Sequence, residues 1–346
     1  MSERIFDRDG RWWDLPSGAA NTIADVPGVT VGHATLQAGA ARTGVTAILP
    51  HDGDLFRHPV PAGMAVLNGF GKSAGLMQLA ELGRIETPIL LTNTFGVPAC
   101  ATALIRRAIT ENPGIGRHLP TVNPLVLECN DGRINDIQAM AVGEAMAQQA
   151  IDAAGPVFEQ GTVGAGTGMR TFGFAGAIGS ASRRVTLPSG IAYTLGALVL
   201  SNFGRPGDLR VLGRRVGTPA EHRSDPEDKG SVIIVYATDA PLDARQLGRL
   251  SRRAGAALGR LGSFWADQSG DVAIAFSTAN RLSLEGDVEP AARLVEARMN
   301  PFLQAAVEAA EEAVLNGLWH ARPVAGYDGL RLPVLGGQLS PDRLMP

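Results

Sequence analysis

The sequence predicts a protein of mixed α/β or α+β class, whose length allows one large domain or two ordinary ones. Short apolar segments with the length of buried strands alternate with helical segments along the whole chain, which is typical of sheets covered by helices. No proline- or serine-rich linker divides the 346 residues. Because 45% of the residues are hydrophobic, the chain can bury a large core.

The expected elements follow one another from the first apolar segment to the last. Seven segments are predicted to be strands: Val45–Leu49, Met64–Leu67, Ile89–Leu91, Leu125–Leu127, Ala192–Leu200, Val232–Tyr236 and Val272–Phe276. Helices are predicted over Ser73–Leu82, Pro98–Thr110, Ile137–Ile151, the stretch from Pro241 to Gly262, and Pro290–Leu318. Proline suits the first turn of the second helix, and Asn135 is a suitable N-cap for the third.

The helix after Pro241 has the clearest amphipathic pattern. One face carries Leu247, Leu250, Ala254, Leu258 and Leu261. The opposite face carries Arg245, Arg249, Arg252, Arg253 and Arg260. These arginines could bind an anion, but a solvated face or a subunit contact is the favoured interpretation.

Composition excludes several classes of function. A net charge of -3 without a basic run argues against nucleic acid or an anionic membrane as a partner. The two cysteines, Cys100 and Cys129, are predicted to be buried free thiols, because their spacing fits neither a disulfide framework nor a zinc site. The six scattered histidines also predict no metal, and no cofactor is expected. Without a signal-like or membrane-spanning segment, we expect a cytoplasmic location.

The segment Gly204–Gly230 is highly charged and contains three prolines. It is predicted to be a long exposed loop, and loops of this length are usually functional or disordered. It ends at Ser231, where a strongly apolar strand begins.

The Gly230–Ser231 junction has two interpretations. On local grounds it is typical of an ordinary turn. It also suits self-cleavage, since a rigidly held hydroxyl can attack the carbonyl before it and form an ester that water then hydrolyses. That reaction leaves Ser231 with a free α-amine, whose usual pKa of about 7.7–8.0 makes it a proton acceptor near neutral pH.

Five segments carry a resemblance to a known family. They are NTIADVPGVTVGHAT from Asn21, GTVGAGTGM at Gly161–Met169, GALVLSNFG at Gly196–Gly204, KGSVIIVYATDAPL at Lys229–Leu242 and SGDVAIAFSTAN at Ser269–Asn280. In this order the chain resembles the DmpA-type aminopeptidases, which comprise L-aminopeptidase/D-amidases and β-peptidyl aminopeptidases. The resemblance extends from about Asn21 to the C-terminal helix.

The resemblance implies an αββα four-layer sandwich, similar in architecture to the N-terminal-nucleophile hydrolases but with a DmpA-type topology. It implies a single hydrolase domain, residues 1–346, that cuts itself into an α chain of residues 1–230 and a β chain of residues 231–346. The αβ units are expected to form a homo-oligomer. The expected substrates are small peptides or aminoacyl amides and esters.

The same resemblance assigns the reacting groups. Ser231 matches the family's nucleophile, and Gly230 matches the residue before the cut. Asn202 matches the side chain that stabilises the oxyanion, a role for which its amide N–H is suited.

Three further residues are assigned in the same way. Ser269 and Asp271 match a serine and an acidic residue that orient the nucleophile's hydroxyl and amine and relay protons. Glu128 matches the acid that binds the ammonium group of the substrate, which accounts for an aminopeptidase preference.

Three segments depart from the family pattern. Cys129-Asn130 stands where some relatives have an aromatic residue after Glu-x. NGFGKSAG places Phe70 and Lys72 at the wall of the expected pocket, and LTNTFGVPA also differs from the usual motif. These departures affect the choice of substrate more than the chemistry.

Three alternatives stand beside this interpretation. Gly71–Gly75 is a formal G-x-S-x-G, in which Ser73 would be the nucleophile of an α/β-hydrolase-type esterase, with a downstream acid and His118, His222 or His320. An acyltransferase of the ornithine-acetyltransferase type would use threonine at the cut, where this chain has Ser231. An uncleaved, non-catalytic scaffold is disfavoured because Ser231, Asn202 and Ser269 are all retained.

Overall fold

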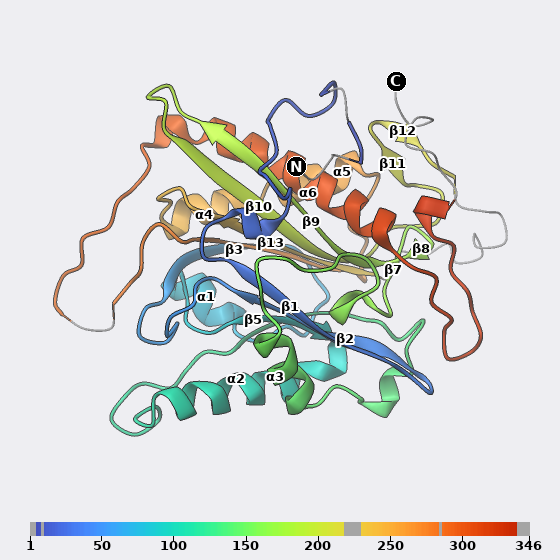
Figure 1. Cartoon of the computed structure of the whole chain (residues 1–346), viewed down its shortest axis with the longest axis horizontal. Coiled ribbons are helices and arrows are strands. Elements are labelled where there is room, and N and C mark those ends of the chain that lie inside the picture. Colours follow the sequence, from blue (N-terminus) through green and yellow to red (C-terminus); the bar gives the residue numbers. More distant parts are fainter. Residues whose placement is uncertain (1–4, 8–9, 218–229, 284–285, 338–346) are drawn as a thin grey trace.

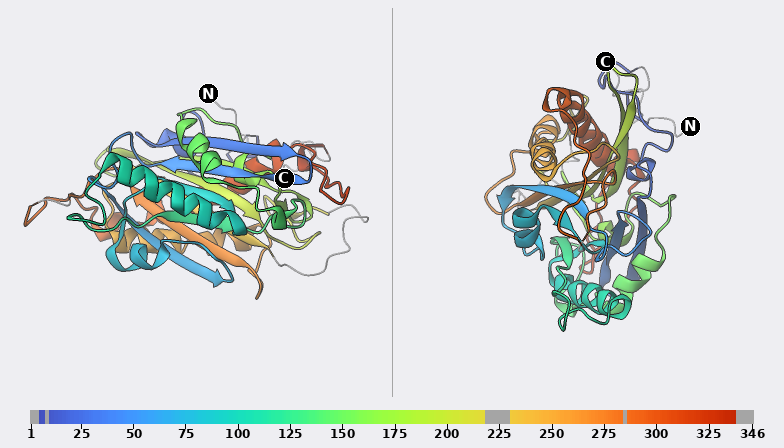
Figure 2. Two further views of the ribbon diagram at one scale, coloured as in Figure 1. Left: turned by 90° about the horizontal axis from the view of Figure 1, so that it is seen from below. Right: turned by 90° about the vertical axis from the view of Figure 1, so that its left-hand side faces the viewer.

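A computed structural model describes residues 5–7, 10–217, 230–283 and 286–337. They form four layers, in which two β-sheets face each other and helices cover the outer face of each sheet (Figure 1). The side view in Figure 2 shows the two sheets stacked between the helical layers. The mixed class and the αββα sandwich are therefore confirmed.

The smaller sheet has the strand order β1-β2-β5-β6. Its strands are β1 (Thr30–Ala38), β2 (Ala41–Leu49), β5 (Ile89–Asn93) and β6 (Leu125–Cys129). β5 and β6 run parallel, so Thr92 lies beside Glu128 at their carboxyl ends. Helices α2 (Val97–Glu111) and α3 (Glu144–Asp152) pack on the outer face of this sheet.

The larger sheet has the strand order β4-β3-β14-β13-β10-β9. Its strands are β3 (Val60–Gly69), β4 (Arg84–Ile85), β9 (Ala177–Thr186), β10 (Ala192–Asn202), β13 (Ser231–Thr238) and β14 (Gly270–Ser277). Its outer face is covered by α4 (Ala244–Ser251), α5 (Ala254–Arg260) and α6 (Asn300–His320), whereas α1 (Leu76–Leu82) packs against β3. Two short hairpins complete the strands of the described ranges. One pairs β7 (Arg170–Thr171) with β8 (Phe174–Ala175), and the other pairs β11 (Arg210–Val211) with β12 (Arg214–Arg215).

Strand β13 is central in the larger sheet, with β10 antiparallel on one side and β14 parallel on the other. Its side chains alternate between two cores: Ile233 and Val235 pack between the sheets, whereas Ile234 and Tyr236 pack under the helices. Because both faces are covered, all eight residues of β13 are buried. This burial explains why the sequence shows a continuous apolar run rather than alternating polarity.

The seven predicted strands all lie within observed strands and are confirmed. The prediction of one helix over Ile137–Ile151 is wrong in its first half, because a short 3₁₀ turn at Ile137–Ala139 ends at Met140 with φ +46° and α3 starts only at Glu144. The Asn135 side chain does not cap a helix. It accepts a hydrogen bond from the Arg42 backbone N–H at 2.9 Å instead.

The segment after Pro241 forms two helices, α4 and α5, rather than one. Its apolar face is buried as predicted. Arg245 and Arg249 form ion pairs with Glu296. This pairing favours a solvated, ion-paired face over an anion site.

The prediction of an exposed loop over Gly204–Gly230 is wrong for its first part. Residues 204–217 contain the β11–β12 hairpin, and Leu209, Val211, Leu212 and Val216 are buried in the core under the helices. The remainder, residues 218–229, lies outside the described residues.

Both cysteines are buried and free, as predicted. Within the described ranges, no helix has the length and apolar content needed to cross a membrane.

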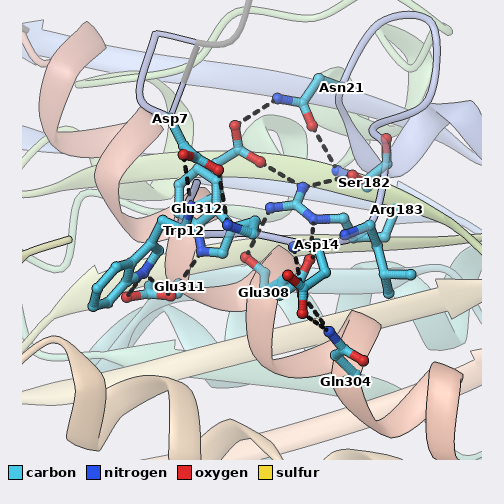
Figure 3. Close-up of polar contacts among 12 residues, drawn as sticks. Asp7, Trp12, Asp14, Asn21, Ser182, Arg183, Gln304, Glu308, Glu311 and Glu312 are labelled. Carbon is cyan, nitrogen blue, oxygen red and sulfur yellow. Dashed lines mark hydrogen bonds and ion pairs between the residues drawn. The ribbon is translucent and has the colours of Figure 1, made fainter. Parts of the chain in front are cut away.

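A buried polar network ties the N-terminal segment and β9 to helix α6 (Figure 3). It contains Trp12, Trp13, Asn21, Arg183, Arg260, Glu308, Glu311 and Glu312. At its centre Arg183 is fully buried, donates from Nε to Glu308 at 3.0 Å and pairs through Nη1 with Glu312. Burial raises the pKa of Glu311 despite the two tryptophan N–H donors and Arg260 beside it. The network joins elements on both sides of residue 230.

We predict that Arg183→Leu is strongly destabilising, because it leaves Glu308 and Glu312 buried without their cation. Loss of one partner from a buried pair costs about 3–5 kcal/mol. Arg184→Leu is the matched control, since Arg184 is the next residue of β9 and is exposed. Urea unfolding followed by tryptophan fluorescence measures both changes, and equal midpoints for the two variants would contradict a stabilising role for the network.

Candidate active site

Ser231 is the first residue of β13 and lies between the ends of two neighbouring strands. It pairs with Asn202, the last residue of β10, and with Gly270, the first residue of β14. The serine is 5% exposed. The sheet register alone therefore brings together three of the segments that the sequence singled out.

The carbonyl of Gly230 is held by two hydrogen bonds. The Ser231 hydroxyl donates to its oxygen at 2.8 Å, and the Gly270 backbone N–H donates to the same oxygen at 3.2 Å. The hydroxyl thus lies next to the peptide bond that precedes it. A second donor is already aimed at the oxygen on which charge would develop during attack.

Gly230 is packed so closely that no side chain fits there. A Cβ on Gly230 would lie 2.0 Å from the Asn202 carbonyl oxygen and 2.7 Å from the Phe203 Cα. Both contacts are with backbone, which cannot move aside as a flexible side chain does. The glycine before Ser231 is therefore required by the close approach of two backbones.

The side chain of Asn202 is fixed at both ends. Its Oδ1 accepts a hydrogen bond from the Arg170 backbone N–H at 2.9 Å, and its Nδ2 donates to the Asn130 carbonyl at 2.9 Å. These contacts determine which end of the amide is the donor. Nδ2 carries a second hydrogen, which is the group that an oxyanion-stabilising role needs.

Ser269 and Asp271 lie on either side of Gly270 and are both buried. The Ser269 hydroxyl donates to Asp271 Oδ1 at 2.7 Å. Asn68 of β3 donates to the Ser269 carbonyl at 2.5 Å and so holds the turn that leads into β14. The pair is thus placed beside the strand neighbour of Ser231.

Glu128 reaches the same region from the other sheet, at the end of β6. The residue is 3% exposed. Oε1 accepts the Lys72 backbone N–H at 2.8 Å, and Oε2 accepts the Thr94 hydroxyl. In the described part of the chain no lysine, arginine or histidine forms an ion pair with this carboxylate. A buried carboxylate without a cation is costly, so Glu128 is a candidate to bind a cation.

Gly71 lies between Glu128 and the Ser231 region. A Cβ on Gly71 would be 3.6 Å from Glu128 Oε1 and 3.9 Å from the Gly270 Cα. The loop from Phe70 to Lys72 therefore passes next to both groups, and a pocket wall formed by Phe70 and Lys72 stays a prediction. Lys72 Nζ lies 3.9 Å above the Phe70 ring and does not contact Glu128.

Two further buried groups border the site, the Cys129 thiol and the Asp131 carboxyl. Neither was assigned a catalytic role from the sequence. Burial raises the pKa of the Cys129 thiol well above its usual value, with Glu128 and Asp271 adding to the shift, so Cys129 stays protonated and is not a nucleophile. Burial also raises the pKa of Asp131 to about 6, against hydrogen bonds from Thr43, Asn135 and Asn93. Asp131 orders the turn after β6.

Ser73 does not have the partner that a nucleophile elbow requires. It follows β3 and precedes α1, but in the described ranges no histidine is hydrogen-bonded to it. His320 is bonded to the carbonyl of Asn316 instead. His222 lies outside the described residues.

Sequence reasoning missed three groups of this site. They are the Thr94 hydroxyl, the Gly270 N–H and the Asn130 carbonyl. Each lies within or next to a segment that the sequence analysis names for another reason. Its place in the site, however, depends on contacts between segments far apart in the chain.

The chain matches a known peptidase family over most of its length. The model of peptidase family S58 matches residues 21–332. The β-peptidyl aminopeptidase BapA of Sphingosinicella microcystinivorans is 39% identical over 349 residues, which cover 91% of this chain and 86% of the relative.

Two solved structures have the same fold. The PH0078 protein from Pyrococcus horikoshii OT3 has a TM-score of 0.88 and 45% identity, covering 95% of this chain and 94% of that one. The L-aminopeptidase D-Ala-esterase/amidase from Ochrobactrum anthropi, described as a new variant of the Ntn hydrolase fold, has a TM-score of 0.84 and 34% identity, covering 95% of each chain. The predicted fold variant is confirmed.

We predict that Gly230→Ala strains the junction by forcing apart the backbones of Gly230 and Asn202. Overpacking of this kind costs about 1–3 kcal/mol. Gly230→Ala should be compared with unchanged Gly230 in proteins that both carry Ser231→Ala, so that neither has the attacking hydroxyl. Gly143→Ala is the control, because no atom lies within 4 Å of its Cβ position. Thermal unfolding measures the difference, and equal melting temperatures would show that the junction tolerates a side chain.

Proposed function

The chain belongs to peptidase family S58, and we propose that it cuts its own Gly230–Ser231 bond and then uses Ser231 to hydrolyse N-terminal aminoacyl bonds. One observation carries the proposal. The Ser231 hydroxyl lies 2.8 Å from the Gly230 carbonyl oxygen, which the Gly270 N–H also holds. The alternatives of a Ser73 esterase, an acyltransferase and an inert scaffold have no comparable support.

Self-cleavage begins with attack of Ser231 Oγ on the Gly230 carbonyl carbon. The Gly270 N–H stabilises the oxyanion that forms. The carbon–nitrogen bond then breaks, the nitrogen takes up the proton, and Gly230 is joined to Ser231 by an ester. Water hydrolyses this ester to give a carboxylate on Gly230 and a free hydroxyl and α-amine on Ser231.

The new α-amine completes the catalytic group. It accepts the proton of the Ser231 hydroxyl as Oγ attacks a substrate carbonyl, which a pKa near neutrality allows. The leaving amine takes that proton, an acyl-enzyme forms on Oγ, and water hydrolyses it. We assign the orientation of the hydroxyl and amine to Ser269 and Asp271, which are hydrogen-bonded to each other on either side of Gly270.

Asn202 and Glu128 supply stabilisation and recognition. The second N–H of Asn202 Nδ2 stabilises the tetrahedral oxyanion, since its other contacts hold the amide in one orientation. Glu128 binds the substrate ammonium, which provides the missing cation. A blocked amine lacks this charge, so the enzyme acts at free N-termini.

The names of the relatives support this class of substrate. Two curated relatives are β-peptidyl aminopeptidases, and a solved neighbour is an L-aminopeptidase and D-Ala-esterase/amidase. We therefore propose small peptides and aminoacyl amides or esters as substrates. Association of αβ units into a homo-oligomer and a cytoplasmic location stay predictions from the sequence.

We predict that the purified protein consists of two polypeptides, residues 1–230 and 231–346, the second beginning Ser-Val-Ile-Ile. Ser231→Ala removes the attacking hydroxyl and should give one uncut, inactive chain. Intact-mass spectrometry and N-terminal sequencing distinguish these states. Ser73→Ala is the control and should be cut and active. Cleavage that persists in Ser231→Ala would contradict the mechanism.

We predict that Glu128→Gln lowers kcat/KM for aminoacyl p-nitroanilides about tenfold to a hundredfold, because it replaces a charge-assisted hydrogen bond with a neutral one. Glu81→Gln, at an exposed position of α1, is the matched control. Equal activity of the parent protein on free-amine and N-acetylated substrates would refute ammonium recognition.

Thr94 provides a second test of the same site. Thr94→Val removes the donor to Glu128 Oε2 and should raise KM for free-amine substrates more than it lowers kcat. Thr94→Ser retains the hydroxyl and should restore the KM. A KM that Thr94→Val leaves unchanged would show that the hydrogen bond does not position Glu128.

A further inference from the structure

We propose that Gly71 is a specificity-determining residue, because its missing side chain leaves room for the substrate atoms between the ammonium and the reacting carbonyl. The inference rests on the proposed function, in which Glu128 binds the ammonium and Ser231 attacks the carbonyl. It concerns which spacing between those two groups the site accepts.

The position of Gly71 defines this space. Its Cβ would point into the gap between Glu128 and Gly270, 3.6 Å from Oε1 and 3.9 Å from the Gly270 Cα. Gly270 in turn faces the nucleophile, since its own Cβ would lie 3.2 Å from Ser231 Oγ. Two glycines therefore separate the ammonium-binding carboxylate from the attacking hydroxyl.

The fold gives no reason for glycine at position 71. Its φ lies outside the left-handed region, and both contacts of a Cβ are at ordinary van der Waals distance. Gly75, in the same loop, is different: its φ is +89°, and a Cβ would lie 2.4 Å from the Pro124 carbonyl oxygen. Gly75 is therefore required by the backbone, whereas an alanine fits at position 71 until a substrate enters.

The loop around Gly71 is held too firmly for an added methyl group to swing aside. The Gly71 N–H donates to the Gly69 carbonyl at 2.9 Å, the Phe70 N–H donates to the Ser269 carbonyl at 3.3 Å, and the Lys72 N–H donates to Glu128 at 2.8 Å. These bonds attach three consecutive residues to both sides of the site. A methyl group on residue 71 would therefore stay in the gap.

Substrates that differ by one methylene between amine and carbonyl will respond differently to this methyl group. A glycyl substrate has one carbon between the two groups, and a β-alanyl substrate has two. The ammonium of both is fixed at Glu128, so the extra methylene must occupy the space that Gly71 leaves open. Discrimination over one methylene is commonly about tenfold or more.

The test compares kcat/KM for β-alanyl and glycyl p-nitroanilide in the parent protein and in Gly71→Ala. The ratio of β-alanyl to glycyl activity should fall about tenfold in Gly71→Ala, and in the same direction in Gly71→Ser. Gly69→Ala, at the end of β3 two residues before Gly71, is the matched control, because its Cβ would face Val66 at 3.6 Å and not the site. It should keep the parent ratio.

The outcomes separate this inference from the proposed function. Intact mass and melting temperature first establish that each variant is cut and folded. If the parent is active but the β-alanyl to glycyl ratio is unchanged in both Gly71 variants, the inference about Gly71 is wrong. An equal fall of that ratio in Gly69→Ala would also contradict it. Either result leaves the proposed function intact. A cut parent that hydrolyses neither substrate would refute the proposed function and this inference with it.

Discussion

The double pairing of β13 is the constraint on which the site depends. With β10 antiparallel on one side and β14 parallel on the other, the first residue of β13 must meet the last residue of β10 and the first residue of β14. That register places Ser231 against Asn202 and Gly270 and presses Gly230 onto the β10 backbone. Moving β13 by one residue would turn its side chains to the opposite cores and remove these contacts together.

The same placement explains how a chain could be cut at residue 230 without losing its fold. A break there removes one covalent bond but no strand pairing, because β13 stays hydrogen-bonded to both neighbours. Arg183, from the N-terminal side of the junction, is buried against Glu308 and Glu312 from the C-terminal side. Separating the two pieces would expose the inter-sheet core and leave these charges unpaired, and both changes are unfavourable.

The sequence predicted the strands well because buried strands are encoded locally, as short apolar runs. It located Ser231, Asn202 and Glu128 through motifs, and the structure places them in one region. Prediction from the sequence failed where contacts between residues far apart in the chain determine the local structure. The helical pattern over Ile137–Ile151 is interrupted at Met140, whose φ is +46°, and the Asn135 side chain is hydrogen-bonded to the β2 backbone instead of capping a helix. The hydrophobic residues near Leu209 looked isolated in a charged segment, but the fold supplies a core for them.

The position of Glu128 relative to Ser231 could not be derived from local pattern for the same reason. Glu128 belongs to the four-stranded sheet and Ser231 to the six-stranded one, so their separation is set by how β6 packs against β13. Packed sheets keep a nearly constant spacing, which makes the distance between carboxylate and hydroxyl a property of the fold rather than of a flexible loop. On the proposed function, variation in substrate choice then arises from what fills the gap between the carboxyl end of β6 and the start of β13. The loop at Phe70–Lys72, hydrogen-bonded to both sides of that gap, is where the chain can change the fit while the Glu128 carboxylate and the Ser231 hydroxyl stay fixed.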